Sequence, residues 1–211
     1  MKKNTSNYWT RLPGVLITSA ALGAAMFVAP ALQAQSTAPP TASTTSHRAK
    51  EFLKEAAQAN QTEIAMANVA ESKTQNPQVK ELAHMMRTDH EANYAQVQTL
   101  AQAHGVTLDP SLDMLNQHEV NRLQKAHDAD FDKDYTKMML KDHVKCIKRF
   151  DKAAADIEEQ DVKQYAESTL PALRHHLQKS EEAARSAGLD EATISSIVKE
   201  LPGEDRPVTV R

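Results

Sequence analysis

Two six-residue stretches decide the fold: residues 85–90 read MMRTDH, and residues 138–143 read MMLKDH. Both lie in stripes of apolar residues that recur at steps of three and four, over residues 79–101 and 131–157. That spacing is typical of one face of an amphipathic helix. The Asp-His pair of each stretch therefore interrupts the inward face of its helix instead of lying on the outside.

Around these two stretches the sequence predicts four long helices and no strand. Ala, Glu, Lys, Gln and Leu dominate from His47 onward, and no run of β-branched residues alternates with polar ones. Pro77 separates the first two helices, since the residue before a proline is pushed out of the helical region and proline suits a first helical turn. Gly105 and Gly188 end the second and fourth helices, and Asp130 caps the start of the third. The expected ranges are about 47–73, 77–104, 130–157 and 162–186.

The connection between the second and third helices is long, covering residues 105–129, whereas the other two connections are short. Leu112, Leu115 and Leu123 predict a short helix within it. A long second connection can cross the length of a four-helix bundle, so that helices two and three run parallel, as in ferritin-like folds. We therefore predict an all-α, ferritin-like four-helix bundle over residues 47–188 with a long crossover between helices two and three, and a C-terminal tail over residues 189–211.

The first 34 residues have the layout of a secretory signal peptide. Lys2, Lys3 and Arg11 form a basic start, residues 14–29 are apolar, and Ala34 is a small residue at the expected cleavage point. The apolar run is shorter than the roughly 20 residues that cross a bilayer. Residues 35–46 are rich in Ser, Thr and Pro and predict a flexible linker. We expect an exported protein, periplasmic or secreted, with no membrane span once the signal peptide is removed.

Charge and cysteine content exclude several classes of function. Without residues 1–34 the chain keeps 22 Lys and Arg residues against 28 Asp and Glu residues, a formal net charge of −6. This balance argues against binding to nucleic acid, which depends on many cationic contacts to phosphates. Cys146 is the only cysteine, so an internal disulfide is excluded. No set of residues predicts an enzymatic reaction. The sequence predicts no protein partner, and it leaves open whether the protein forms a homo-oligomer.

Six polar residues fall on the inward faces of the four helices, near their midpoints. The positions lie about 12 to 16 residues into helices that are about 40 Å long. A residue at mid-height stays there whichever way its helix points, so we expect these side chains to meet in one layer. They are Glu63, Asp89, His90, Asp142, His143 and His176.

Two interpretations of this polar layer stay open. An uncompensated charge in an apolar interior costs several kcal/mol, so the groups must find partners. They can hydrogen-bond among themselves and fix the register of the helices, or they can share a transition-metal ion such as iron, manganese, zinc or copper. The spacing differs from the Glu-x-x-His pairs of di-iron sites, and an Asp beside a His can instead orient that ligand or a neighbouring one.

Four segments carry a resemblance to a known family. They are FLKEAAQANQTEIAMANVA at 52–70, NPQVKELAHMMRTDH at 76–90, FDKDYTKMMLKDH at 131–143 and TLPALRHHL at 169–177. In this order, over about residues 49–184, they resemble the domain-of-unknown-function family 4142, a group of exported bacterial proteins often labelled predicted outer-membrane proteins. The resemblance implies a ferritin-like helical domain in the periplasm, no established activity, and a shared polar core at the six positions above.

Two function hypotheses follow from the sequence. In the first, the protein is a metal-binding protein of the cell envelope, with Glu63, His90, His143 and His176 as direct ligands and Asp89 and Asp142 as ligands or as residues that orient them. In the second, it is a non-enzymatic envelope or stress-associated protein, and the polar layer serves packing alone.

Overall fold

The computed structural model describes residues 45–201. The predicted signal peptide, most of the predicted linker and residues 202–211 of the predicted tail lie outside this range. Within it the chain is entirely helical and contains no strand, and none of its helices is both long and apolar enough to cross a membrane. The helices are α1 (His47–Lys73), α2 (Pro77–Ala103), α3 (Met114–Gln124), α4 (Asp128–Asp156), α5 (Gln160–Ser186) and α6 (Glu191–Val198).

Local chemistry explains where α2 begins and ends. The side chain of Asn76 accepts a hydrogen bond from the backbone N–H of Gln78 at 3.0 Å, and Pro77 occupies the first turn. At the other end Gly105 adopts a φ of 62°, and the backbone N–H of Val106 donates to the carbonyl of Ala101 at 2.8 Å. A glycine in this left-handed conformation closes the helix without the steric cost that other residues incur.

The start of α4 differs from the prediction by two residues. The helix begins at Asp128 instead of near Asp130, and its N-cap residue, His127, makes no capping hydrogen bond through its side chain. Asp128 and Asp130 both lie in the first turn, where a negative charge is stabilised by the helix dipole. Asp130 therefore contributes to this terminus as a first-turn charge and not as a cap.

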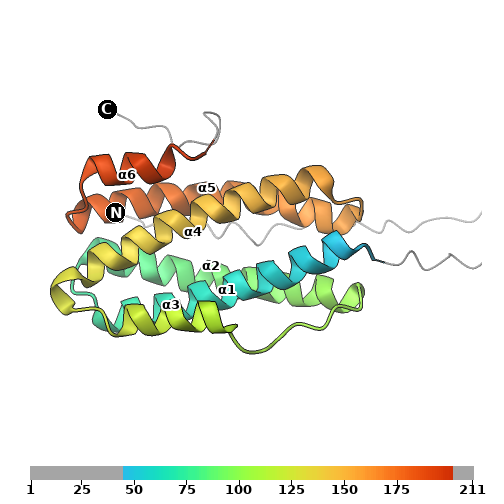
Figure 1. The fold of residues 1–211 in the computed structure, drawn as a ribbon, viewed down its shortest axis with the longest axis horizontal. Coiled ribbons are helices and arrows are strands. Elements are labelled where there is room, and N and C mark those ends of the chain that lie inside the picture. The colour runs from blue at the N-terminus through green and yellow to red at the C-terminus, as the bar shows by residue number, and fades with distance from the viewer. Residues whose placement is uncertain (1–44, 202–211) are drawn as a thin grey trace, which may run out of the picture. The chain divides into compact units, whose positions relative to one another are not determined.

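The four long helices pack side by side as a bundle (Figure 1), with α1 against α2 and α4, and α5 against α4 and α2. Contacts at one end of the bundle give the helix directions. His104, which follows α2, contacts Asp161 in the first turn of α5 through Nε2 and Oδ2 at 2.9 Å. Ser46, which precedes α1, donates through its backbone N–H to Glu159, which follows α4. Because α2 and α4 both finish at this end, they run parallel, and the connection that contains α3 crosses the length of the bundle.

The segment after Gly188 departs from the predicted tail, because residues 191–198 form the helix α6. Asp190 caps this helix by accepting from the backbone N–H of Thr193 at 2.8 Å. Ile194 and Leu201 are almost completely buried, and α6 packs against α4 and α5 (Figure 1). The bundle therefore continues past residue 188, where the sequence was expected to lose its pattern.

The crossover contains the expected short helix, but its apolar residues are used differently. α3 packs against α1 and α4 and buries Val120 and Leu123. Leu115, which was among the residues that predicted this helix, is 80% exposed, as its neighbour Met114 is at 88%. The buried face of α3 thus lies in its second half.

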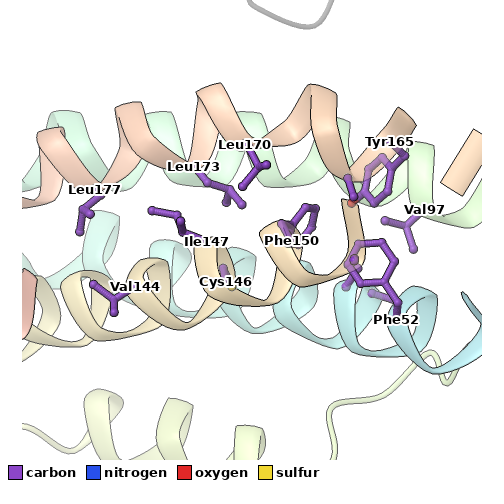
Figure 2. Packing of buried hydrophobic residues seen from close by; sticks show 14 of the residues in the cluster. Phe52, Val97, Val144, Cys146, Ile147, Phe150, Tyr165, Leu170, Leu173 and Leu177 are labelled. Carbon is purple, nitrogen blue, oxygen red and sulfur yellow. The ribbon is translucent and has the colours of Figure 1, made fainter. Parts of the chain in front are cut away.

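The interior consists of two apolar clusters and a layer of buried polar side chains at mid-bundle. One cluster includes Phe52 of α1, Phe150 of α4 and Tyr165 of α5, whose rings lie together in Figure 2 with centroids 5.0 to 6.0 Å apart. The other cluster includes Met86 of α2 and Met139 of α4. The polar layer contains these buried side chains: Asn60, Glu63, His90, Asn93, His143 and His176.

Candidate metal centre

Three histidines from three different helices meet in the polar layer. His90 on α2, His143 on α4 and His176 on α5 are exposed by 5%, 1% and 2%. One ring nitrogen of each lies within 4.8 Å of a ring nitrogen of the other two. Their ring centroids are 5.3 to 5.8 Å apart. The mid-height positions of the three histidines therefore bring them to a common point.

Each imidazole is anchored to the protein by one ring nitrogen. Nδ1 of His143 lies 2.9 Å from the carbonyl oxygen of Met139, and a carbonyl only accepts, so this nitrogen carries the proton. Nδ1 of His90 donates in the same way to Oδ1 of Asn60 at 2.8 Å. These two hydrogen bonds fix both the tautomer and the orientation of each ring.

The third imidazole is held by a carboxyl group. Nε2 of His176 lies 3.0 Å from Oδ2 of Asp89 and donates to it. Asp89, which lies on α2, is therefore not a fourth member of this group. It orients His176, which lies on α5. A carboxyl that accepts from the distal nitrogen of a histidine is the usual support for a metal ligand.

The anchoring leaves one nitrogen with a free lone pair on each ring. Nε2 of His143 and Nδ1 of His176 face each other at 3.3 Å. Nε2 of His90 is fully buried and has no hydrogen-bond partner within residues 45–201. Two nitrogens bound to one tetrahedral ion at about 2.0–2.1 Å lie about 3.3 Å apart. The separation between His143 and His176 is therefore that of two ligands of one ion.

The surroundings keep two of these rings neutral. Burial, followed by the charges of His176 and His143, lowers the pKa of His90 well below 6.5. Burial and the charge of His176 lower the pKa of His143 to about 3. Neutral imidazole is the form that binds metal ions, so at neutral pH these rings need to lose no proton before they bind.

A hydrogen-bonded network that was not predicted from the sequence supports this centre. Nδ2 of Asn60 donates to the carbonyl of Ala56 at 2.8 Å and to Oδ1 of Asn93 at 2.7 Å, so Oδ1 of Asn60 is turned toward His90. The hydroxyl of Tyr165 donates to the same Oδ1 of Asn93 at 2.7 Å. Asn60 lies three residues before Glu63, and Asn93 lies three residues after His90, and this helical spacing was the signal in the sequence that could have revealed them.

The two remaining candidates lie apart from the histidines. The side chains of Glu63 and Asp142 line a pocket between α1, α3 and α4, and neither belongs to the group of three converging nitrogens. Asp142 forms an ion pair with Lys145 at 3.2 Å. Burial, followed by the charges of Asp142 and Glu119, raises the pKa of Glu63 well above 4.5. The six predicted residues therefore divide into a histidine centre with its supporting Asp89 and a separate acidic pair.

The bundle is similar to a solved structure of another protein of unknown function. The crystal structure of a DUF305 fragment from Deinococcus radiodurans matches with a TM-score of 0.60 and 13% sequence identity, over 67% of this chain and 97% of that chain. At this identity the match concerns the fold alone. No curated protein matches the chain.

The family comparison covers most of the chain. The family described as "Domain of unknown function (DUF4142)" matches residues 33–183, which include all of α1, α2, α3 and α4 and most of α5. The three histidines and Asp89 fall within the matched region. The protein is therefore a member of the DUF4142 family.

Proposed function

We propose that this protein binds one transition-metal ion through His90, His143 and His176. The observation that carries the proposal is Nε2 of His90, a buried acceptor that no donor within residues 45–201 satisfies. An unsatisfied buried polar atom costs about 1–3 kcal/mol. A cation held by the three ring nitrogens, which lie within 4.8 Å of one another, would remove that cost.

The donor set narrows the choice of metal. Imidazole nitrogens suit zinc, copper and iron, whereas manganese prefers oxygen ligands. Three neutral imidazoles leave a coordination position open, which a water molecule or a substrate can fill. Asp89, Asn60 and the carbonyl of Met139 would hold the three rings in place. We propose that the protein binds or handles a metal ion. We assign no reaction to this centre.

The wider setting of the centre is also a proposal. The parallel run of α2 and α4 and the long crossover support a ferritin-like four-helix arrangement. The composition of residues 1–34 supports export to the periplasm or out of the cell. N-terminal sequencing of the mature protein tests export: a chain that begins at Gln35 supports it, and one that keeps its first 34 residues contradicts it.

Metal analysis of the purified protein tests the binding proposal. After removal of bound metal, titration with Zn²⁺, Cu²⁺ and Fe²⁺ is expected to give one ion per chain. An ion at about 100 times its Kd stabilises the fold by about 2.7 kcal/mol. For a domain of this size that corresponds to a rise in Tm of about 5–10 °C.

Two variants separate the centre from adventitious binding. His90→Gln removes one converging nitrogen and is expected to abolish the rise in Tm. His118→Gln changes an exposed histidine on α3 and is expected to keep it. The proposal fails if the wild type holds no stoichiometric metal and no added cation raises its Tm. The polar layer would then serve packing alone, in an envelope or stress-associated protein without a metal.

A further inference from the structure

The carboxyl group of Glu63 lacks a partner, although it lies in the interior. Glu63 is 3% exposed, and its Oε2 is fully buried without a hydrogen-bond partner among residues 45–201. The side chain forms part of the wall of a pocket of about 370 Å³ between α1, α3 and α4. A buried carboxyl without a partner is costly, and a positive charge in the adjoining pocket would offset that cost.

The charges around the pocket leave a negative excess. Three basic side chains line it, but each already has an acidic partner: Lys54 with Glu51 at 3.7 Å, Lys145 with Asp142 at 3.2 Å and Arg149 with Glu55 at 3.0 Å. Glu119, from α3, adds a second carboxyl to that of Glu63 and acts on it electrostatically. None of the ion pairs within residues 45–201 involves Glu63 or Glu119. A ligand that complements this wall is a cation.

The pocket is built in advance of any ligand. Nε2 of Gln58 on α1 donates to the carbonyl of Ser111 at 2.8 Å, and its Oε1 accepts from the backbone N–H of Asp113 at 3.0 Å. These two hydrogen bonds hold the start of α3 against α1. The volume lies in the range of about 300–1,000 Å³ that is usual for small-molecule sites.

The rest of the wall favours an organic cation over a metal ion. Direct binding of a metal ion by the protein requires several ligand atoms around one centre. Within the described part of the chain, His90, His143 and His176 form a group whose ligand atoms lie within 4.8 Å of one another. The carboxyl groups of this pocket form no such group there. Ala59 and Cys146 form an apolar part of the pocket wall. Leu115, which also lines the pocket, is 80% exposed.

We propose that this pocket binds a small organic cation, an alkyl amine or guanidine, with its charged group at Glu63 and Glu119. The hydrocarbon part lies along Ala59 and is covered by Leu115, which accounts for an exposed apolar side chain beside a charged pocket. The proposal does not depend on the metal centre, because the three histidines do not line this pocket.

Calorimetric titration of the metal-free full chain with agmatine and with 1,4-diaminobutane tests the proposal. The wild type is expected to bind one molecule per chain. Glu63→Gln keeps the shape of the side chain but removes its charge, and is expected to weaken binding at least about tenfold, as loss of a charged hydrogen bond does. Glu119→Gln, on the other wall, is expected to weaken binding severalfold.

Three controls define the outcome. Glu81→Gln, at an exposed position on α2, and His90→Gln, in the histidine centre, are expected to bind both amines as the wild type does. Uncharged 1-butanol is expected not to bind. The proposal is overturned if the wild type binds neither amine, if Glu63→Gln binds them equally well with an unchanged circular dichroism spectrum, or if Mn²⁺ binds stoichiometrically to the wild type and displaces agmatine.

Discussion

Acid is expected to destabilise the metal-free protein through the buried histidines. The folded-state pKa of His143 is about 3, whereas the ordinary value is 6.5. Between these two values the unfolded chain binds a proton that the folded chain does not bind. The free energy of unfolding therefore falls as the pH falls below about 6.5, and the contribution of His143 is complete above that value.

The size of the effect follows from the width of this pH window. Going from pH 7 to pH 5, a histidine with these two pKa values lowers the free energy of unfolding by about 2 kcal/mol. His90, whose pKa is also lowered mainly by burial, adds a loss in the same direction. Glu63, whose pKa is raised mainly by burial, acts in the opposite direction above pH 4.5. Wild type and a variant at position 143 both contain His90 and Glu63, so the contributions of these two residues largely cancel when the two proteins are compared.

The assay is urea unfolding at pH 7 and pH 5 in the presence of EDTA, followed by circular dichroism. Wild type is expected to lose about 2 kcal/mol more stability between these pH values than His143→Gln, whose amide can still donate to the carbonyl of Met139. His118→Gln, on the exposed side of α3, is expected to lose as much as the wild type. Equal acid losses in wild type and His143→Gln would refute the assignment of a buried, neutral His143.

Three further substitutions test the packing around the centre, each by its shift in urea-unfolding free energy. Leu177→Ala empties a fully buried position on α5 and is expected to cost about 2–5 kcal/mol, so a loss below about 1 kcal/mol would contradict its burial. Tyr165→Phe removes the hydrogen bond to Asn93 and is expected to cost about 1 kcal/mol, whereas an unchanged stability would mean that this bond contributes nothing. Gly188→Ala places a side chain at a φ of 80° and is expected to cost about 1 kcal/mol, and a gain in stability would contradict the left-handed conformation.

The long helices could be predicted from the sequence because their ends carry strong local signals. Asn76 and Pro77 separate α1 from α2, and the predicted limits of α1, residues 47–73, match the structure. α6 was missed because it has eight residues and follows a helix-ending glycine, yet Ile194, Ile197 and Leu201 repeat at helical spacing. Two or three apolar residues decide such a short helix, and only their burial against α4 and α5 distinguishes it from a loop.

The height of the site residues and the inward direction of the three histidines could be predicted, but the direction of Glu63 and Asp142 around their helix axes could not. Asn60 and Glu63 lie one turn apart on α1 and differ by about 60° around its axis. That rotation is enough to direct Asn60 toward His90 and Glu63 toward the pocket with α3 and α4. Since the angle at which each helix faces its neighbours depends on packing along its whole length, spacing within one helix does not determine it.

A hydrogen-bonded packing layer and a metal site differ in the protons on their polar atoms. A packing layer needs a donor for each acceptor, whereas a metal site needs nitrogens that carry no proton. In the network beside the histidines, Tyr165 and Asn60 both donate to Oδ1 of Asn93, so donors meet an acceptor. Among the histidines, a second proton on His176 would supply one donor to Nε2 of His143, at 3.3 Å. Nε2 of His90 would still have none. With or without a proton, Nε2 of His90 thus stays unsatisfied when the layer is held by hydrogen bonds alone. The single cation that we propose would use all three ring nitrogens, which lie within 4.8 Å of one another, and for this reason we favour the metal interpretation over packing alone.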